Sequence, residues 1–413
     1  MRILFVTWDG PQVAYLESLF LPIFAGLAEH GVHFDILQFR WGPEAQAEAI
    51  ARRCAAAGCG YRHSTIWRGL GGLGPFAAAF AGGREVRRAV RDFGSDAVMP
   101  RSHMPGIAVA AAGGARLRPI LFDADGFAVD EKVELGLLSA SGPTYRILRR
   151  VEAGMVRASE SVIVRSAAAA RILRERAGGS IEPGRFHVVA NGRDEAVFHP
   201  SDEGARRAVR AELGIDPAVP LAVYAGSVGA QYRFDLIRDF AEALALQRPD
   251  ARLLVLSGSP ELAEAELGGT GSLAPIVMRA PPDRVARYLA AADIGLAFRA
   301  QSFSVQGVAP VKLGEYLLCG VPAVGNVAVG DTGAALAAGV FLDDALGAAA
   351  AARWLVEEVM PRREDYRTRA RAVGTERFSL RRSIDDYLAA LAPVANDRRP
   401  GAPLPVARAG TSL

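Results

Sequence analysis

The chain has 413 residues, of which half are hydrophobic and 23% are charged, a composition typical of a globular protein and not of a disordered one. This length is sufficient for two domains of ordinary size. The formal net charge is only +3, and no dense run of basic residues occurs, which argues against a protein that binds nucleic acid.

The first part of the chain alternates between strand-like and helix-like segments. It opens with an apolar strand at 3–6, a loop that contains Gly10 and Pro11, a helix over about 13–30, and a second strand at 34–39. A strand, a helix and a strand in this order indicate parallel pairing. Further strands are predicted at 97–99, 119–122, 161–164 and 186–189.

The same alternation restarts after a turn-rich stretch at 191–200. The elements predicted there are helices at 203–213 and 234–247, a glycine loop at 226–229, and strands at 221–224, 252–256, around 277, at 294–298 and at 323–324. We therefore predict an α/β protein with two doubly wound, Rossmann-like domains. Ligands of such sheets bind at the carboxyl ends of the strands, so two facing domains would enclose one cleft.

The domain boundaries can be placed from this pattern. We predict an N-terminal domain at 1–190, a linker at 191–200 and a C-terminal domain at 201–392. The remaining tail, 393–413, is rich in Pro, Arg and Gly, and we expect it to be disordered.

The cysteines and the N-terminal sequence indicate the cellular compartment in which the protein is expected. Cys54, Cys59 and Cys319 match neither a zinc-ligand spacing nor a disulfide scaffold, which fits a reducing environment. The chain opens on a strand pattern without signal-peptide architecture, and it contains no run of 18 apolar residues. We expect a cytoplasmic location. Four arginines on one face of a predicted helix indicate a solvated face, with peripheral contact to the inner face of the membrane as the alternative: Arg84, Arg87, Arg88 and Arg91.

Lysine is rare in this chain: only Lys132 and Lys312 occur among 48 basic residues. Lys312 lies in the segment 310–316, which reads as a loop entering a short helix. In the first turn of a helix, free backbone N–H groups and the positive dipole end favour phosphate, and Lys312 would add a compact positive charge. Glu315 could accept hydrogen bonds from both hydroxyls of a ribose. The segment predicts a nucleoside-diphosphate site, with a structural Lys312–Glu315 salt bridge as the alternative.

Two further candidates lie after predicted strands of the first half. His103 comes directly after the strand at 97–99, at the edge that would face the cleft, so it is either a substrate contact or a structural histidine. The pair Asp123 and Asp125 looks like the acidic pair that binds a divalent metal in some sugar-transferring enzymes. Without further ligands, a capping or turn role is the more ordinary interpretation.

Two glycine motifs are weaker. Residues 69–74 formally match a dinucleotide fingerprint, but 62–68 is a poor buried strand and Pro75 interrupts the segment after the motif, so we favour a loop. Residues 225–229 fall one residue short of a nucleophile elbow. Hydrolases with that elbow place a histidine after the serine, whereas all six histidines here precede Ser227, which excludes that class.

Taken together, these segments resemble glycosyltransferase family 4, which has the two-domain GT-B fold. The resemblance covers about residues 1–392. It rests on the opening strand with its Gly10 loop, the linker at 191–200, the segment 292–296 and, most specifically, the segment 310–322. Residues 122–127, with Asp130 and Glu131 shortly after them, also look like a subgroup pattern.

The resemblance implies transfer of a sugar from a nucleotide sugar, usually with retention of anomeric configuration and without a metal or other cofactor. By that resemblance, Glu315 would hold the donor ribose and the loop 302–310 would approach the sugar and diphosphate. Gly10 would let the backbone approach the phosphates, and His103 would lie beside the transferred sugar. The acceptor, whether a glycan, a lipid-linked molecule or a small molecule, would dock near His103 and Asp125.

The chain departs from the family at two places. Gly307 stands where the family often has a glutamate, and Ser227 stands where it often has an arginine, which leaves Arg233 as the basic residue of that loop. Arg299 and Lys312 would supply the missing charge. We therefore assign His103, Lys312 and Arg233 as catalytic, Gly10, Ser227, Arg299 and Glu315 as donor-binding, and Asp125 as acceptor-side. A non-catalytic nucleotide-sugar-binding partner of another transferase and a nucleotide-sugar epimerase are the alternatives.

Overall fold

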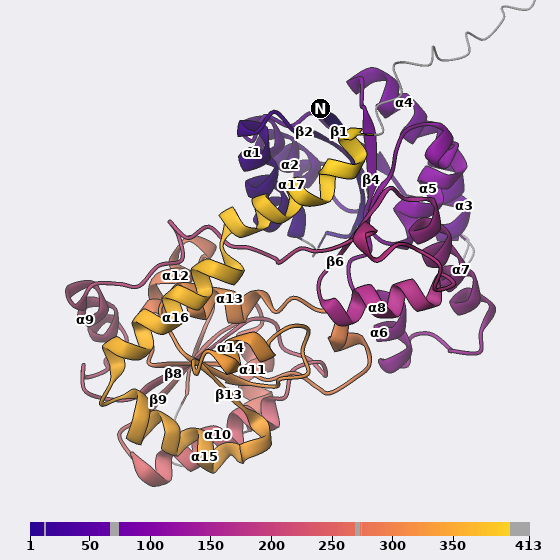
Figure 1. Ribbon diagram of the computed structural model, residues 1–413. Coiled ribbons are helices and arrows are strands. Elements are labelled where there is room, and N and C mark those ends of the chain that lie inside the picture. The colour runs from indigo at the N-terminus through magenta and orange to yellow at the C-terminus, as the bar shows by residue number, and fades with distance from the viewer. Residues whose placement is uncertain (12–13, 67–73, 269–272, 274, 397–413) are drawn as a thin grey trace, which may run out of the picture.

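The computed structural model describes residues 1–11, 14–66, 74–268, 273 and 275–396, and it consists of two α/β halves (Figure 1). In the N-terminal half the strands are β1 (Arg2–Asp9), β2 (His33–Arg40), β3 (Tyr61–Thr65), β4 (Ala97–Pro100), β5 (Leu121–Asp123), β6 (Ser161–Val164) and β7 (Phe186–Val188). They pair in parallel in the order β3-β2-β1-β4 and β5-β6-β7, and two isolated bridges join β4 to the β5 segment. The surrounding helices are η1 (Leu16–Phe20), α1 (Leu21–Glu29), α2 (Glu44–Ala56), α3 (Gly74–Ala81), α4 (Gly83–Phe93), α5 (His103–Ala112), η3 (Gly114–Arg116), α6 (Ala128–Glu134), α7 (Pro143–Ala158), α8 (Ala167–Arg176) and η4 (Pro183–Arg185).

The C-terminal half repeats this design with a single parallel sheet in the order β10-β9-β8-β11-β12-β13. Its strands are β8 (Leu221–Ala225), β9 (Arg252–Leu256), β10 (Ile276–Met278), β11 (Ile294–Ala297), β12 (Ala323–Gly325) and β13 (Phe341–Asp343). Its helices are α9 (Glu203–Glu212), α10 (Phe234–Gln247), α11 (Pro260–Leu267), α12 (Pro282–Ala290), η5 (Ser304–Gly307), α13 (Val311–Leu318), α14 (Gly333–Ala337), η6 (Asp344–Leu346), α15 (Gly347–Arg353), η7 (Trp354–Val359), α16 (Arg363–Phe378) and α17 (Leu380–Asn396). The order reverses between β1 and β4 in one half and between β8 and β11 in the other, and such switch points open a ligand crevice at the carboxyl ends of the strands.

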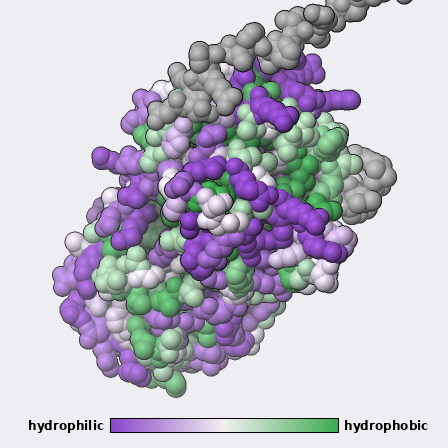
Figure 2. All heavy atoms as spheres, turned by 45° about the vertical axis from the view of Figure 1, so that its right-hand side comes forward, coloured by the Kyte–Doolittle hydropathy of each residue, from purple (hydrophilic) through white to green (hydrophobic). Residues whose placement is uncertain are grey.

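Both sheets are covered by helices on both faces, which is why their central strands are continuously apolar. Residues 3–6 of β1 are completely buried, and two apolar clusters lie against the N-terminal sheet and two against the C-terminal one. On the face shown in Figure 2, hydrophilic and hydrophobic residues are interspersed, and the densest hydrophobic area lies in the upper right, over the N-terminal half. In the described part of the chain, no helix combines the length and the apolar character needed to cross a bilayer.

Two strands differ from the sequence prediction. β3 pairs in parallel with β2, although its sequence reads as a poor buried strand. The reason is that β3 lies at the edge of the sheet and is only partly buried, so its polar residues are tolerated there. β13 is a further strand that the sequence pattern did not reveal. The glycine motif after β3 lies almost entirely outside the described residues.

Helix α17 does not belong with the C-terminal half, to which the sequence prediction assigned residues up to 392. Its apolar residues 387, 390, 391 and 394 recur at helical spacing and join the core under β1 and α1. The helix also continues to Asn396, into the segment that was predicted to be disordered. In Figure 1 it runs from the C-terminal half back across the N-terminal one.

The chain therefore crosses between the halves twice, and the two crossings are bonded to each other. The backbone N–H of Arg193 donates to Phe378 at 2.8 Å, and that of Leu380 donates to Arg193 at 2.8 Å. Gly192 is required here, because a Cβ on it would lie 2.1 Å from the carbonyl oxygen of Ser379.

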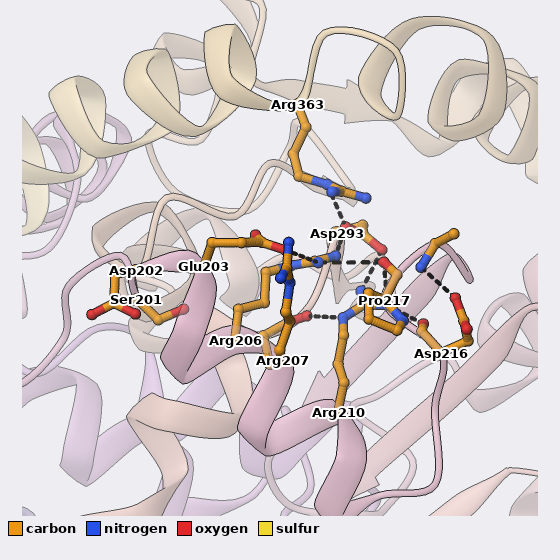
Figure 3. A network of polar contacts seen from close by, with 12 residues as sticks. Ser201, Asp202, Glu203, Arg206, Arg207, Arg210, Asp216, Pro217, Asp293 and Arg363 are labelled. Atoms are coloured by element: carbon orange, nitrogen blue, oxygen red, sulfur yellow. Dashed lines mark hydrogen bonds and ion pairs between the residues drawn. The ribbon is translucent and has the colours of Figure 1, made fainter.

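A buried acidic centre organises the C-terminal half at the amino end of β11 (Figure 3). The Asp293 carboxylate accepts hydrogen bonds from Arg206 at 2.9 Å, Arg210 at 2.7 Å and the backbone N–H of Leu221 at 2.9 Å. Arg363 lies 3.0 Å from the same carboxylate. Because the crevice opens at the opposite, carboxyl edge of the sheet, this part of the family-like segment 292–296 has a structural role.

Candidate functional site

A cavity of about 290 Å³ lies between the two halves, at the carboxyl edges of both sheets. The N-terminal half contributes Tyr15, Arg101, Asp125, Glu131 and Arg165, and the C-terminal half contributes Tyr232, Arg299, Lys312 and the segment 307–311. We call it the interdomain cavity. Four of these side chains are cationic, but Arg101 and Arg165 are bound to Asp123, so Arg299 and Lys312 are the cations that could meet an anion.

Lys312 lies in the first turn of α13, and its side chain is enclosed by aromatic rings. The Nζ atom is 4.0 Å from the ring centroid of Tyr224 and 4.3 Å from that of Tyr232, which is the geometry of a cation–π contact. Among the described residues, Nζ has no hydrogen-bond partner. Burial, reinforced by the charge of Arg299, lowers the pKa of Lys312 to about 7. A buried ammonium group without a hydrogen-bond partner is a site that a ligand phosphate would satisfy.

Glu315 lies one turn further along α13 and pairs with Arg193 of the linker. The Nε atom of Arg193 is 2.9 Å from a Glu315 carboxylate oxygen. Burial raises the pKa of Glu315, against the opposing charges of Arg193 and Lys312. Glu315 and Lys312, both in the described part of the chain, do not form the salt bridge that was the structural alternative. Arg193 was not predicted as a site residue, although the linker motif that contains it was noted.

Arg299 lies just beyond the carboxyl end of β11 and is the second cation of the C-terminal wall. Its guanidinium lies 5.4 Å from the ring centroid of Tyr232 and 3.9 Å from a carboxylate oxygen of Glu131. The sequence prediction paired Arg299 with Lys312 as phosphate-binding charges. The structure brings the two residues to the same cavity and to the same tyrosine ring.

The acidic pair of the N-terminal wall is bound by arginines. Arg165 donates to both oxygens of the Asp123 carboxylate, at 2.8 and 2.7 Å, and Arg101 donates to it at 3.0 Å. Arg101 also binds Asp125, which has a positive φ of 53°. Burial raises the pKa of Asp125, although Arg101 opposes that shift. Guanidinium groups thus take the oxygens that a metal ion would need, and no metal-ligating group of three or more side chains occurs among the described residues.

His103 opens α5 and lies in a second cavity of about 530 Å³, which belongs to the N-terminal half. We call it the N-terminal cavity. It shares Tyr15, Arg101, Asp125 and Ala128 with the interdomain cavity. The His103 side chain is buried, with Nε2 3.6 Å from Glu152 and Nδ1 3.1 Å from the hydroxyl of Ser102. The structure therefore places His103 next to the interdomain cavity and not in its wall.

Three predicted site residues lie outside the described linings of both cavities. Gly10 packs under Trp41, whose ring would lie 2.7 Å from a Cβ at this position. Ser227 is exposed, and its carbonyl accepts a hydrogen bond from Tyr224 at 2.6 Å. The guanidinium of Arg233 is held by Asp235, two residues further along, at 2.6 to 2.9 Å. These local contacts explain why none of the three reaches the cavity.

The cleft is closed by contacts of α6 with the η5 segment and with the loop between β8 and α10. Glu134 accepts a hydrogen bond from the backbone N–H of Ser304 at 2.9 Å, and Glu131 accepts one from Gln231 at 3.0 Å. Next to them, a Cβ on Gly307 would lie 2.8 Å from the ring of Phe127. The glycine at 307, where the resemblance leads one to expect a glutamate, is thus required by the close approach of the two halves.

Comparisons with known proteins agree with this architecture. The family model of the glycosyl transferase 4-like domain matches residues 19–192. Alpha-maltose-1-phosphate synthase of Mycolicibacterium smegmatis is 32% identical over 121 residues, which is 29% of this chain and 30% of that protein. D-inositol 3-phosphate glycosyltransferase of Segniliparus rotundus is 30% identical over 224 residues, 50% of this chain and 47% of that protein. The chain thus spans less than half of the length of these curated relatives.

Solved structures with low sequence identity share the whole fold. Anabaena HepE in complex with UDP-glucose matches with a TM-score of 0.65 at 17% identity, covering 95% of this chain and all of that one. WaaG, a glycosyltransferase involved in lipopolysaccharide biosynthesis, matches with a TM-score of 0.65 at 18% identity, covering 95% and 99%. The two facing Rossmann-like halves are therefore a GT-B fold, as predicted. The match to the glycosyl transferase 4-like domain over residues 19–192 confirms the resemblance seen in the sequence for that part of the chain.

Proposed function

We propose that this protein is a metal-independent, retaining glycosyltransferase that takes its sugar from a nucleoside-diphosphate sugar. The observation that carries the proposal is the unpartnered Lys312 ammonium group in the wall of the interdomain cavity, beside Arg299. A diphosphate is the anion that would satisfy both cations and the free N–H groups at the start of α13. The relatives' names and the UDP-glucose complex of a protein with the same fold support this donor class.

In this proposal, the cavity stabilises the charge that develops as the donor is cleaved. The acceptor oxygen forms the new bond to the anomeric carbon while the bond from that carbon to the phosphate oxygen breaks, and the hydroxyl proton leaves with the diphosphate. Lys312 and Arg299 lie where that negative charge grows, and fixed charges of this kind usually supply a large part of catalysis. Because the pKa of Lys312 is about 7, binding of a phosphate anion would draw a proton onto the amine.

The remaining donor contacts come from α13 and the linker. Glu315 would accept hydrogen bonds from the ribose hydroxyls, with Arg193 holding its carboxylate in place. The contacts of Glu134 and Glu131 with the C-terminal half would keep the cleft closed. A closed cleft excludes water, which would otherwise capture the activated sugar.

The test is a nucleotide-release assay with UDP-, GDP-, dTDP- and ADP-sugars, with and without candidate acceptors. We expect acceptor-dependent release for one donor class, and a loss of turnover in Glu315→Gln with the fold intact. Glu261→Gln, an exposed glutamate in the first turn of α11, is the matched control. Nucleotide binding without release for every acceptor would instead indicate a non-catalytic partner. Conversion of the donor without an acceptor would indicate an epimerase, an activity that appears in the names of two proteins with the same fold.

A further inference from the structure

The N-terminal cavity is placed to present a second substrate to the interdomain cavity. The two cavities share Tyr15, Arg101, Asp125 and Ala128, so they lie next to each other. Its volume of about 530 Å³ lies within the range of sites for small organic ligands. In Figure 1 its contributing helices α3, α5, α6 and α7 lie together on the side of the N-terminal half away from α1.

Much of the N-terminal cavity is lined by apolar and aromatic side chains. Trp8 comes from β1, Pro75 and Phe76 from α3, Met104 from α5, and Leu148 from α7. Trp8 and Phe76 are partly buried, so each leaves part of its ring open to a ligand. Rings presented in this way favour a flat, apolar partner, because they add stacking contacts to the burial of apolar area.

The charges of the lining leave no surplus for a phosphate. Among the described residues of the lining, the basic side chains are Arg101, Lys132 and His103, and the acidic ones are Asp9 and Asp125. Arg101 is already bound to Asp123 and Asp125. Lys132 is the exposed cation of the set. A phosphate group taken out of water needs several charged donors, which the interdomain cavity offers and this one does not.

The polar atoms of the N-terminal cavity include those at its border with the interdomain cavity. Asp125 lies at that border, and Ser102 and His103 come after the same strand end as Arg101. A carboxylate at the border would accept a hydrogen bond from a ligand hydroxyl and so aim the hydroxyl oxygen at the interdomain cavity. The cavity thus combines apolar walls with a hydroxyl-binding end.

We infer that the N-terminal cavity binds an uncharged, hydroxylated acceptor with an apolar ring system, held between Trp8 and Phe76, and not a phosphorylated sugar or polyol. The inference rests on the proposed function, because the bound molecule is an acceptor only if the protein is a glycosyltransferase. The inferred ligand class differs from the compounds in the names of the relatives, which are phosphorylated.

The test uses the full chain and calorimetric titration with two probes, the flavanone naringenin and D-inositol 3-phosphate, beside UDP. We expect naringenin to bind more tightly than the inositol phosphate. Phe76→Ala should weaken naringenin binding about tenfold, the effect of removing one ring contact of about 1.4 kcal/mol. Phe80→Ala is the matched control, because Phe80 lies one turn further on α3, is 70% exposed and does not line the cavity. Trp8→Leu provides a second, independent loss of a ring.

Two results would overturn the inference. One is tighter binding of D-inositol 3-phosphate than of naringenin. The other is naringenin binding that is absent, or that survives unchanged in both Phe76→Ala and Trp8→Leu. UDP binding in the same samples reports on the interdomain cavity alone, so a failure of the proposed function would appear as lost UDP binding and a failure of this inference would not.

Discussion

Replacing Lys312 with methionine removes a buried charge and keeps an unbranched side chain of similar length. The structure predicts two opposite effects of Lys312→Met. The folded protein should become more stable near neutral pH, because an ammonium group without a hydrogen-bond partner is no longer buried between Tyr224 and Tyr232. The affinity for a nucleoside diphosphate should fall, because the cation that would meet the phosphates is gone.

The magnitude can be worked from the pKa. A fall from 10.5 to about 7 corresponds to about 4 to 5 kcal/mol of unfavourable free energy for the charged form of Lys312 in the folded protein. Because the folded pKa is depressed, the unfolded chain binds more protons between about pH 7 and 10.5, so the stability of the parent protein should rise with pH across this window. In Lys312→Met that rise should be absent. The advantage of the variant should therefore be greatest below about pH 7 and should disappear above about pH 10.5.

The assay is thermal unfolding of both proteins from pH 6.5 to 10, and then UDP titration at pH 6.5 and 8.5. In the parent protein, UDP affinity should decrease as the pH rises above 7, since binding requires the protonated amine; the variant should lack this dependence. Lys132→Met, at the exposed second lysine of the chain, is the control for stability. If Lys312→Met were no more stable than the parent at pH 7, and if it bound UDP with the same affinity and pH profile, the reasoning from burial would be refuted.

Two further substitutions test the structural supports of the site. Asp293→Asn removes the counter-ion of Arg206 and Arg210, whose side chains are 1% and 0% exposed. The substitution should therefore destabilise the protein by about 3 to 5 kcal/mol. An unchanged unfolding midpoint would contradict the structural role of Asp293. Gly307→Ala places a Cβ 2.8 Å from the ring of Phe127 and should slow transfer with UDP affinity retained. Equal turnover in Gly307→Ala and the parent would show that closure does not need this approach.

The sequence predicted the architecture well because hydrophobic periodicity reports burial. The strand at 161–164 and the helix at 234–247 have the predicted bounds. Periodicity does not say which surface a helix packs on, and for this reason α17 was assigned to the wrong half. It also underrates edge strands such as β3, whose polar residues are only partly buried.

The site was predicted less completely, because its chemistry depends on contacts between distant segments. The positions of Lys312 and Arg299, after a loop and after a strand, indicated that both would face the cleft, and both line the interdomain cavity. The pairing of Glu315 with Arg193 could not, since 122 positions separate them and the sequence offered Lys312 as a nearer partner. Arg233 was predicted to face the cleft because it is the basic residue of the expected loop. Its guanidinium instead binds Asp235, two residues further along.

The double crossing of the chain has a consequence for attempts to recombine this protein with its relatives. The N-terminal half is not a continuous piece of sequence, because α17 completes its core from the far end of the chain, whereas the C-terminal half is one continuous insert. A graft that exchanges donor specificity should therefore replace about 193–378 as an insert and keep 1–192 together with 379–396. A hybrid joined at the linker alone would lose Tyr387 and Leu391, which pack on the N-terminal sheet. Its C-terminal helix would come from the other protein, and its apolar residues would not match this sheet.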